Sequence, residues 1–325
     1  MSVPAPDLLS PALLSSALRL RAGFVDEYPF PSQFLDLGGH RYHYIDCGPT
    51  QSGPNPPGPK QPGPVLCVHG NPTWSFAWRH LVKDLSPARR VLAVDHLGCG
   101  FSDKPTSYPY DLAHHIDNLV RFIEALDLRN ISLVVHDWGG AIGFGAAARL
   151  PDRFSRFVVC NTAAFRSSRI PFRIAVCRWP IVGTLALRGF NAFSLAAVTM
   201  ATTRPGGLPP AVRAGYLAPY DSWDHRVAVN RFVKDIPMSP AHPSYQTLVE
   251  VENSLSHWAD SPMLLAWGLK DWCFNVEFLA EWVRRFPNAN TLTFEGAGHY
   301  LFEDAHPDLS HHVTGFLNRA EQPKT

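Results

Sequence analysis

The stretch Val134-Val135-His136-Asp137-Trp138-Gly139-Gly140-Ala141-Ile142-Gly143 carries the strongest structural signal in the 325-residue sequence. It begins in a short apolar run, which is typical of a buried strand, and it ends in a glycine-rich segment with a helical pattern. A sharp strand-to-helix turn of this kind lifts one side chain above the edge of a sheet. The pattern therefore predicts that Asp137 stands on such a turn.

Short apolar runs recur on both sides of this turn, and each is followed by a turn or a helical pattern. The runs are Val65–Val68, Val91–Val94, Ile131–Val135, Phe157–Cys160, Met263–Trp267 and Thr291–Phe294. Strands that are apolar on both faces and alternate with helices are typical of a mostly parallel sheet covered on both sides. A hairpin pattern around Gly38-Gly39 adds two strands, so we expect an α/β fold with an eight-stranded, mostly parallel sheet.

The alternation of strands and helices stops between Cys160 and Met263, where about a hundred residues rich in Arg, Pro and aromatic side chains intervene. Such a pause predicts a helical cap over the carboxyl edge of the sheet, where ligands bind in open α/β sheets. An unrelated second domain is the alternative. We place an N-terminal extension at residues 1–32, the core at 33–162 and 259–325, and the cap at 163–258. Residues 49–64, rich in Pro and Gly, predict an exposed loop.

An aspartate on the turn at position 137 restricts the chemistry of the site. A carboxylate that attacks an alkyl carbon forms an ester whose acyl carbon belongs to the enzyme, and water activated by a histidine can split that ester. A serine in this place would form an inert ether instead. The residue types therefore indicate displacement at an sp³ carbon, although Val135 departs from the glycine that opens the usual G-x-S-x-G pattern.

Two further groups must follow the nucleophile along the chain, first an acid and then a histidine. His299 comes after the last predicted strand, within Gly296-Ala297-Gly298-His299-Tyr300, which is the position of the general base. Asp271 follows the strand Met263–Trp267 and is predicted to orient the imidazole. Asn71 and Trp138 are placed to supply N–H donors that bind a leaving anion.

Five segments together carry a resemblance to a known family. They are His69–Ser75, Asp95–Asp103, His136–Gly140, Gly268–Asp271 and Gly298-His299. In this combination the chain resembles the haloalkane dehalogenases, a family of α/β-hydrolases, over residues 33–318. The resemblance implies five site residues: Asp137 as nucleophile, His299 as base, Asp271 as acid, and Asn71 with Trp138 as the halide-binding pair.

The resemblance leaves more than one reaction open. An Asp acid combined with the Asn and Trp pair resembles the third dehalogenase subfamily, which is similar to the olefin-forming β-lactone decarboxylases, and Lys270–Phe274 leans toward the latter. Epoxide hydrolases share the turn and the triad but need two cap tyrosines, for which Tyr216, Tyr220 and Tyr245 are available. A ligand receptor on the same fold is the non-catalytic alternative.

The charge and apolar pattern limit the partners of the chain. Its 29 Lys and Arg against 28 Asp and Glu give a net charge of +1, which predicts neither nucleic acid nor an anionic membrane surface as a partner. No uncharged apolar run reaches the roughly 18 residues of a membrane span, so we expect no membrane insertion. The apolar stretch Leu8–Leu14 lacks a preceding basic residue and does not predict a signal peptide.

The cysteine pattern bears on the compartment and on metals. The six cysteines are scattered without C-x-x-C pairs, and they are Cys47, Cys67, Cys99, Cys160, Cys177 and Cys273. This predicts buried free thiols in a reducing compartment, hence a cytoplasmic location, and no metal site or cofactor. We expect a small apolar organic substrate and a halide product, and the sequence leaves the oligomeric state open.

Overall fold

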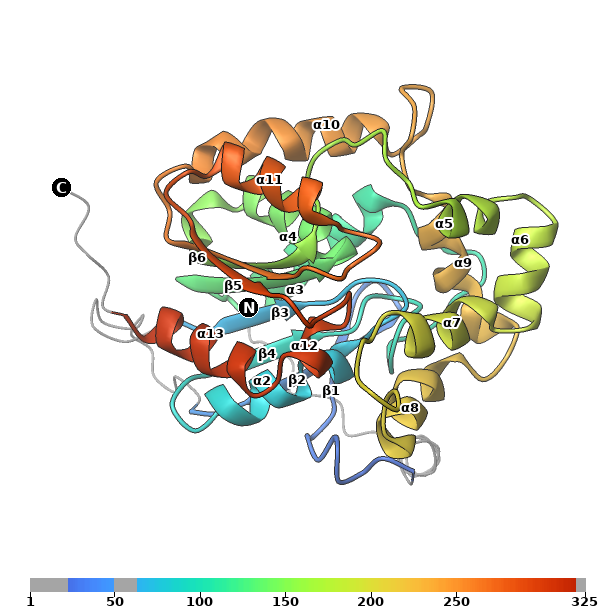
Figure 1. The fold of residues 1–325 in the computed structure, drawn as a ribbon, viewed down its shortest axis with the longest axis horizontal. Coiled ribbons are helices and arrows are strands. Elements are labelled where there is room, and N and C mark those ends of the chain that lie inside the picture. Colours follow the sequence, from blue (N-terminus) through green and yellow to red (C-terminus); the bar gives the residue numbers. More distant parts are fainter. Residues whose placement is uncertain (1–22, 50–62, 320–325) are drawn as a thin grey trace.

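The computed structural model describes residues 23–49 and 63–319. The predictions for Leu8–Leu14 and for most of the proline-rich loop lie outside the described residues. Within them, an eight-stranded sheet forms the centre of the molecule and helices cover both of its faces (Figure 1). This confirms the predicted α/β fold class with a mostly parallel sheet.

The strands lie in the order β1-β2-β4-β3-β5-β6-β7-β8 across the sheet. Their bounds are β1 Gln33–Asp36, β2 Arg41–Cys47, β3 Val65–Val68, β4 Val91–Val94, β5 Ile131–Asp137, β6 Phe154–Thr162, β7 Met263–Gly268 and β8 Asn290–Phe294. The β1–β2 hairpin and the β2–β4 pair are antiparallel, and all other neighbours are parallel. The strand order reverses at β3, which lies between β4 and β5, and such a reversal is where open α/β sheets bind ligands.

Two groups of helices cover the sheet, one on each face (Figure 1). On one face lie α3 Leu112–Ala125, α4 Trp138–Arg149, α10 Tyr245–Ser254 and α11 Val276–Arg285; on the other lie α2 Arg79–Leu85, α12 Leu301–Asp304 and α13 Asp308–Asn318. Each face has its own buried apolar cluster. On the α4 face Phe144 stacks on Phe157 with ring centroids 5.1 Å apart. The two clusters hold the carboxyl ends of the parallel strands in fixed positions.

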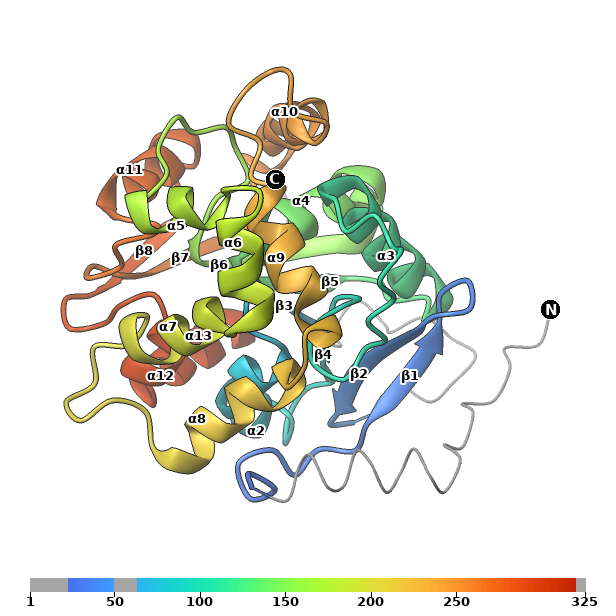
Figure 2. The same cartoon turned by 90° about the vertical axis from the view of Figure 1, so that its right-hand side faces the viewer.

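The chain between β6 and β7 forms short helices that extend from one end of the sheet (Figures 1 and 2). These are α5 Phe172–Cys177, α6 Val182–Thr184, the π-helical turn η3 Leu185–Gly189, α7 Ala192–Met200, α8 Pro210–Leu217, the 3-10 turns η4 Ala218–Tyr220 and η5 Asp224–Arg226, and α9 Val227–Lys234. The last part of this chain, α10 and the 3-10 turn η6 Leu255–Trp258, lies over the α4 face of the sheet instead. The predicted cap limits, residues 163 and 258, fall just after β6 and just before β7.

In the part of the chain that the structure describes, no one helix has both the length and the apolar composition to cross a bilayer. The helical pair Val182–Gly189 and Ala192–Met200 meets both criteria only when the two are counted together, and the chain bends by 72° between them. All six cysteines are free. Cys67, Cys99 and Cys160 are buried as expected, whereas Cys47, Cys177 and Cys273 are half-buried. All three differ from the expectation of buried thiols, and two of them, Cys177 and Cys273, line a cavity.

Candidate active site

Asp137 is the last residue of β5 and directly precedes α4. Its φ of 53° and ψ of −126° are strained for a residue with a side chain. Two glycines allow the neighbouring backbone to approach this turn. A Cβ on Gly139 would lie 2.1 Å from the Val68 carbonyl oxygen, and a Cβ on Gly70 would lie 2.1 Å from Asp137 Oδ1. Larger residues at either position would therefore force the loop after β3 away from the turn.

Val135 stands where the usual motif has its first glycine. The space that its side chain needs comes from Gly143 on the following helix, since a Cβ there would lie 2.8 Å from Val135 Cγ1. Glycine at position 143 thus lets α4 pack closely over β5 in spite of the valine. The departure from the motif is accommodated locally, and the tight turn at Asp137 is retained.

Asp137, Asp271 and His299 meet at the carboxyl end of the sheet, as the sequence predicts. They follow or end three different strands, β5, β7 and β8. His299 Nδ1 lies 2.8 Å from Asp271 Oδ2, and His299 Nε2 lies 3.7 Å from Asp137 Oδ2. Since Nδ1–H donates to a carboxylate, Nε2 is the ring nitrogen that faces the nucleophile.

Backbone donors fix one oxygen of the Asp137 carboxylate. Asp137 Oδ1 accepts a hydrogen bond from the Asn71 N–H at 2.7 Å, and the Trp138 N–H also donates to this carboxylate. These are the two N–H groups that the sequence assigns to the anion-binding loop and the turn. The other oxygen, Oδ2, is the one nearer to the imidazole of His299.

Burial and charge shift the pKa values of the nucleophile and the histidine. Burial raises the pKa of the Asp137 carboxyl, and the charge of His299 and the two backbone N–H groups oppose only part of this rise. Burial works to lower the pKa of the His299 imidazole, but the charges of Asp271 and Asp137 outweigh it, so this pKa is raised. The imidazole therefore keeps its proton to a higher pH than a free histidine does.

Two residues that the sequence analysis gave no role support the triad. Asn161, at the end of β6, donates to Asp271 Oδ2 at 2.9 Å and also bonds both backbone polar groups of Gly268. His136 Nε2 lies 2.9 Å from the backbone oxygen of His299. The sequence signal for Asn161 is a polar residue at the carboxyl end of the strand next to β7. The only sequence signal for His136 is its position beside the nucleophile.

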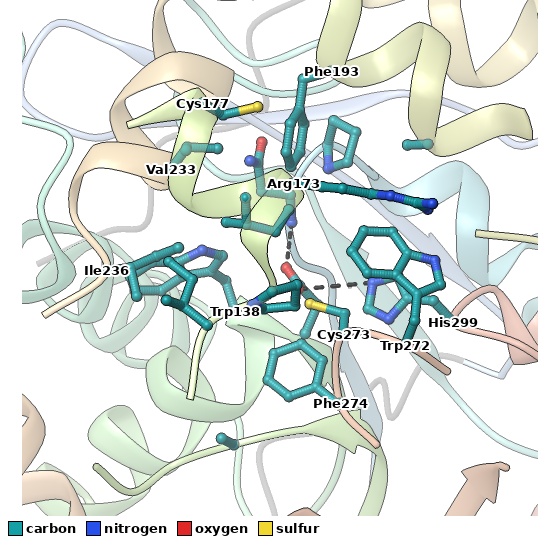
Figure 3. A pocket seen from close by; sticks show the side chains of 18 of the residues that line it. Trp138, Arg173, Cys177, Phe193, Val233, Ile236, Trp272, Cys273, Phe274 and His299 are labelled. Carbon is teal, nitrogen blue, oxygen red and sulfur yellow. Dashed lines mark hydrogen bonds and ion pairs between the residues drawn. The ribbon is translucent and has the colours of Figure 1, made fainter. Parts of the chain in front are cut away.

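The three residues adjoin a cavity of about 590 Å³ between the sheet and the helices of segment 163–258. Asp137 and His299 line it, and most of the remaining wall is apolar. Figure 3 shows Phe193 and Cys177 from the helical segment on one side, with Trp272, Phe274 and His299 on the other. A cavity of this size and lining suits a small apolar molecule with few polar groups.

Asn71 and Trp138, the predicted anion-binding pair, also line this cavity. Asn71 Nδ2 donates to the Val229 carbonyl oxygen at 3.3 Å, and because an amide nitrogen carries two hydrogens, a second donor remains. The Trp138 ring packs against Phe232 with centroids 5.4 Å apart. The structure thus brings together all five residues that the sequence selected.

Within the described residues, no tyrosine lines the cavity. The Tyr216 hydroxyl donates to Glu303 at 2.6 Å, and the Tyr220 hydroxyl donates to the Thr73 carbonyl oxygen at 3.3 Å. Tyr245 begins α10, outside the lining. The geometry therefore does not support the epoxide hydrolase alternative, which needs two phenols beside the nucleophile.

His114, His115, His257 and His306 lie outside the cavity lining. His115 is buried with its ring stacked on Phe232 at 4.4 Å, and His306 stacks on His80 at 4.0 Å. Over residues 23–49 and 63–319, no group of three or more His, Cys, Asp or Glu side chains is arranged to hold a metal ion. These histidines contribute packing.

Comparison with known proteins places the chain among enzymes. Residues 63–187 match the family described as alpha/beta hydrolase fold. The chain is 40% identical over 299 residues to a cis-3-alkyl-4-alkyloxetan-2-one decarboxylase of Shewanella oneidensis, a match that covers 90% of each chain. It is 32% identical over 303 residues to a haloalkane dehalogenase of Mycolicibacterium paratuberculosis, covering 89% of this chain and 93% of the relative.

Solved structures agree on the fold. The haloalkane dehalogenase DbeA from Bradyrhizobium elkani superimposes with a TM-score of 0.78 at 24% identity, covering 89% of this chain and 97% of that chain. At this identity the likeness extends to the fold alone.

Proposed function

Because this chain belongs to the haloalkane dehalogenase family of α/β-hydrolases, we propose that it decarboxylates cis-3-alkyl-4-alkyl β-lactones to alkenes through an ester on Asp137. Two relatives named for this decarboxylation are 40% and 41% identical to this chain, whereas the haloalkane dehalogenase of Mycolicibacterium paratuberculosis is 32% identical. This difference favours the order opposite to the one that the sequence alone gave to the two activities. The observation that carries the proposal is a buried carboxylate, paired with a His–Asp couple, at the wall of a mostly apolar cavity.

In the first step, Asp137 Oδ2 attacks ring carbon C4 of the lactone from the side opposite to the ring oxygen. The C4–O bond breaks, and its electron pair stays on the ring oxygen, which becomes part of a free carboxylate. The second amide hydrogen of Asn71 and the indole N–H of Trp138 are the proposed donors to this new anion. One donor of this type contributes about 3 to 4 kcal/mol to an anion-stabilising site.

In the second step, the bond between C3 and the new carboxylate breaks. Its electron pair forms the C3=C4 double bond, the bond from C4 to Asp137 breaks, and carbon dioxide leaves. The Asp137 carboxylate is restored without water and without a net proton. Because attack inverts C4 and the two groups then leave from opposite sides, a cis lactone gives a cis alkene.

His299 has an electrostatic role in this scheme. Its raised pKa favours the imidazolium, which lies 3.7 Å from Asp137 Oδ2 and stabilises that carboxylate as the leaving group of the second step. Asp271 and Asn161 hold the ring in place. A haloalkane dehalogenase needs instead a neutral His299 that takes a proton from water.

Dehalogenation is the second candidate, and the pairing of Asn71 with Trp138 beside Asp137 favours it. In that reaction Asp137 displaces a halide from carbon, the halide lies between the two N–H donors, and water activated by His299 splits the ester. The first step is the same in both candidates. They differ in whether water enters.

One side-by-side assay separates the candidates. The purified protein is incubated with a long-chain cis-3,4-dialkyl β-lactone and, separately, with a panel of bromoalkanes, and alkene, carbon dioxide and bromide are measured. We expect cis alkene and carbon dioxide from the lactone. Bromide release without alkene would instead support the dehalogenase, a diol from an added epoxide would support an epoxide hydrolase, and no product from any substrate would support the receptor.

The His299→Ala variant tests the role of water. With 1-bromobutane, a dehalogenase of this design accumulates one butyl group on Asp137, which intact-mass analysis detects. With the lactone, the ester decomposes without water, although more slowly without the imidazolium, so we expect slower alkene release and no adduct that persists. His306→Ala, a change outside the cavity, is the matched control and should behave as the unchanged protein.

A further inference from the structure

The outer side of the helical segment exposes an unusual number of large apolar side chains. Eight of the eleven such side chains in the described residues lie on this segment: Phe172, Trp179, Ile181, Val182, Leu185, Phe190, Leu195 and Trp223. Phe172 is 80% exposed, Phe190 77% and Ile181 73%. Isolated exposed apolar residues are common on proteins, but a group on adjoining helices marks an interaction surface. We call the first seven of these residues the cap face.

The cap face is one continuous region of the fold. Its residues come from α5, α6, η3 and α7 and the turns that join them. In Figure 1 α6 lies at the outer end of the molecule, and Figure 2, which views that end directly, shows α5, α6 and α7 next to one another. The surface is therefore at a protruding end of the molecule, away from the two helix layers of the sheet.

The charged side chains that residues 163–220 themselves contribute are all positive. Residues 163–220 contain seven arginines and no Asp, Glu or Lys. Three of the arginines form ion pairs with acids from other segments, namely Arg166, Arg169 and Arg188. The other four, Arg173, Arg178, Arg204 and Arg213, have no carboxylate within ion-pair distance among the described residues. The rest of the chain is acidic, so the net charge of +1 for the whole sequence conceals this cluster of arginines.

The cavity reaches the surface among the same helices. Of the residues that line it, Arg169, Arg173, Ala192 and Ala196 are exposed, and they lie on or next to α5 and α7. The inner sides of these helices contribute Ile174 and Phe193 to the cavity wall, while their outer sides carry the cap face. A molecule that enters between α5 and α7 therefore passes the cap face.

We propose that the cap face docks on the surface of an anionic lipid bilayer, with its apolar side chains among the headgroups and with Arg173 and Arg178, the sequence neighbours of Phe172 and Trp179, against lipid phosphates. Exposed aromatic and aliphatic side chains combined with arginine are the combination that binds this interface without a spanning segment. A second copy of the chain is a poorer occupant, because two such surfaces would bring like charges together. The benefit of docking rests on the proposed function: the dialkyl lactone and the alkene both dissolve in lipid, so a docked protein can exchange them between the bilayer and its cavity.

Vesicle sedimentation of the full-length protein, without any substrate, tests the docking by itself. We expect the protein to sediment with vesicles of phosphatidylcholine and phosphatidylglycerol, less with phosphatidylcholine alone, and less as salt increases. The double variant Ile181→Asp/Phe190→Asp should lower the bound fraction at least about fivefold. The matched control Val276→Asp/Val283→Asp places the same charges at exposed apolar positions of α11 and should bind as the unchanged protein does.

Several results would overturn the docking proposal. One is the absence of sedimentation with anionic vesicles, and another is an equal loss of vesicle binding in the two double variants. A third is an oligomer that forms without vesicles and that only Ile181→Asp/Phe190→Asp dissociates, because it would assign the surface to another protein chain. Thermal melting of each variant shows whether it is folded. The sedimentation test contains no substrate, so its result is independent of the lactone assay. Vesicle binding by a protein that forms no alkene in that assay would refute the proposed function and keep the docking. Alkene formation by a protein that does not bind vesicles would keep the function and refute the docking.

Discussion

β5 and the helices α5 to α7 differ in how the chain supports them. All seven residues of β5 are buried, and its last residue, Asp137, is held by backbone N–H groups and by close approaches that only glycine allows. The helices α5 and α7 bury Ile174, Ser194 and Val198 but leave most of their remaining side chains half-buried or exposed. Their positions depend on a few contacts with the core.

This difference separates chemistry from selectivity. The atoms proposed to react belong to strand ends whose places are determined by the sheet, so the reaction depends on the core. The shape of the cavity is set by side chains from several short helices, so the size of the substrate depends on the segment 163–258. Mutations that test the two regions should therefore change different quantities.

The largest expected effect comes from the nucleophile. Asp137→Ala removes both carboxylate oxygens, and we expect alkene formation to fall by at least about 10⁴-fold, because no other group can form the ester. Phe193→Ala, in the cavity wall contributed by α7, should change KM and the preferred alkyl chain length and leave most of the turnover rate. The measurement is kcat and KM with a series of lactones. Equal losses of kcat in the two variants would contradict the division between core and cap.

The second prediction concerns the contact that joins the two regions. Arg79, at the start of α2, is fully buried and donates to Glu303 at 2.8 Å through Nη2, while Tyr216 of α8 donates to the same carboxylate at 2.6 Å. Glu303→Gln removes the doubly bonded carboxylate and leaves the buried guanidinium with only the partly exposed Glu27, 3.3 Å from its Nε. We therefore expect a loss of about 3 kcal/mol in the free energy of unfolding. Urea denaturation measures it.

Tyr216→Phe is the matched control for this contact. It removes one hydrogen bond from the helical segment and keeps the Arg79–Glu303 pair, so the expected loss is only about 1 kcal/mol. If Tyr216→Phe were as destabilising as Glu303→Gln, the stability would come from the attachment of α8 and not from the buried ion pair.

The sequence predicted the core well because its signals are local. Apolar runs of strand length, glycines at close approaches and polar residues after strand ends each predict one element or one site residue, and the structure brings these residues together. Asn161 and His136 were the omissions, and the polar side chain of Asn161 at a strand end becomes informative only once its neighbour Asp271 is known. The backbone of Asn161 also has a positive φ of 30°, a conformation that depends on the tertiary structure and not on the local sequence.

The helical segment could not be predicted in the same way. Its helices are short, six residues in α5 and three in α6, so no periodic pattern distinguishes a side that lines the cavity from a side that faces outward. Phe172 and Phe193 look alike in the sequence, yet the first is exposed and the second lines the cavity. The choice between them depends on tertiary packing that local sequence does not encode.

The smallest expected effect is the pH dependence of a second contact between the regions. Asp235, directly after α9, accepts hydrogen bonds from the Leu112 N–H of α3 at 2.8 Å and from Ser244 Oγ at 2.6 Å. Burial outweighs both bonds and raises the pKa of Asp235 to about 7. In the unfolded chain the same carboxyl loses its proton near pH 4. Its contribution to stability is therefore complete below about pH 4 and is lost as the pH rises to about 7, with a slope of at most about 1.4 kcal/mol per pH unit.

Asp235→Asn isolates this contribution, because an amide has the shape of the protonated carboxyl and does not titrate. We expect the unchanged protein to lose stability relative to the variant as the pH rises from 5 to 7, when urea denaturation is measured for both at each pH. Only the difference between the two proteins is informative, since the groups around His299 titrate equally in both. Parallel pH profiles would mean that Asp235 is already ionised in the folded protein, and that the contact between α9 and α3 is as insensitive to pH as the core.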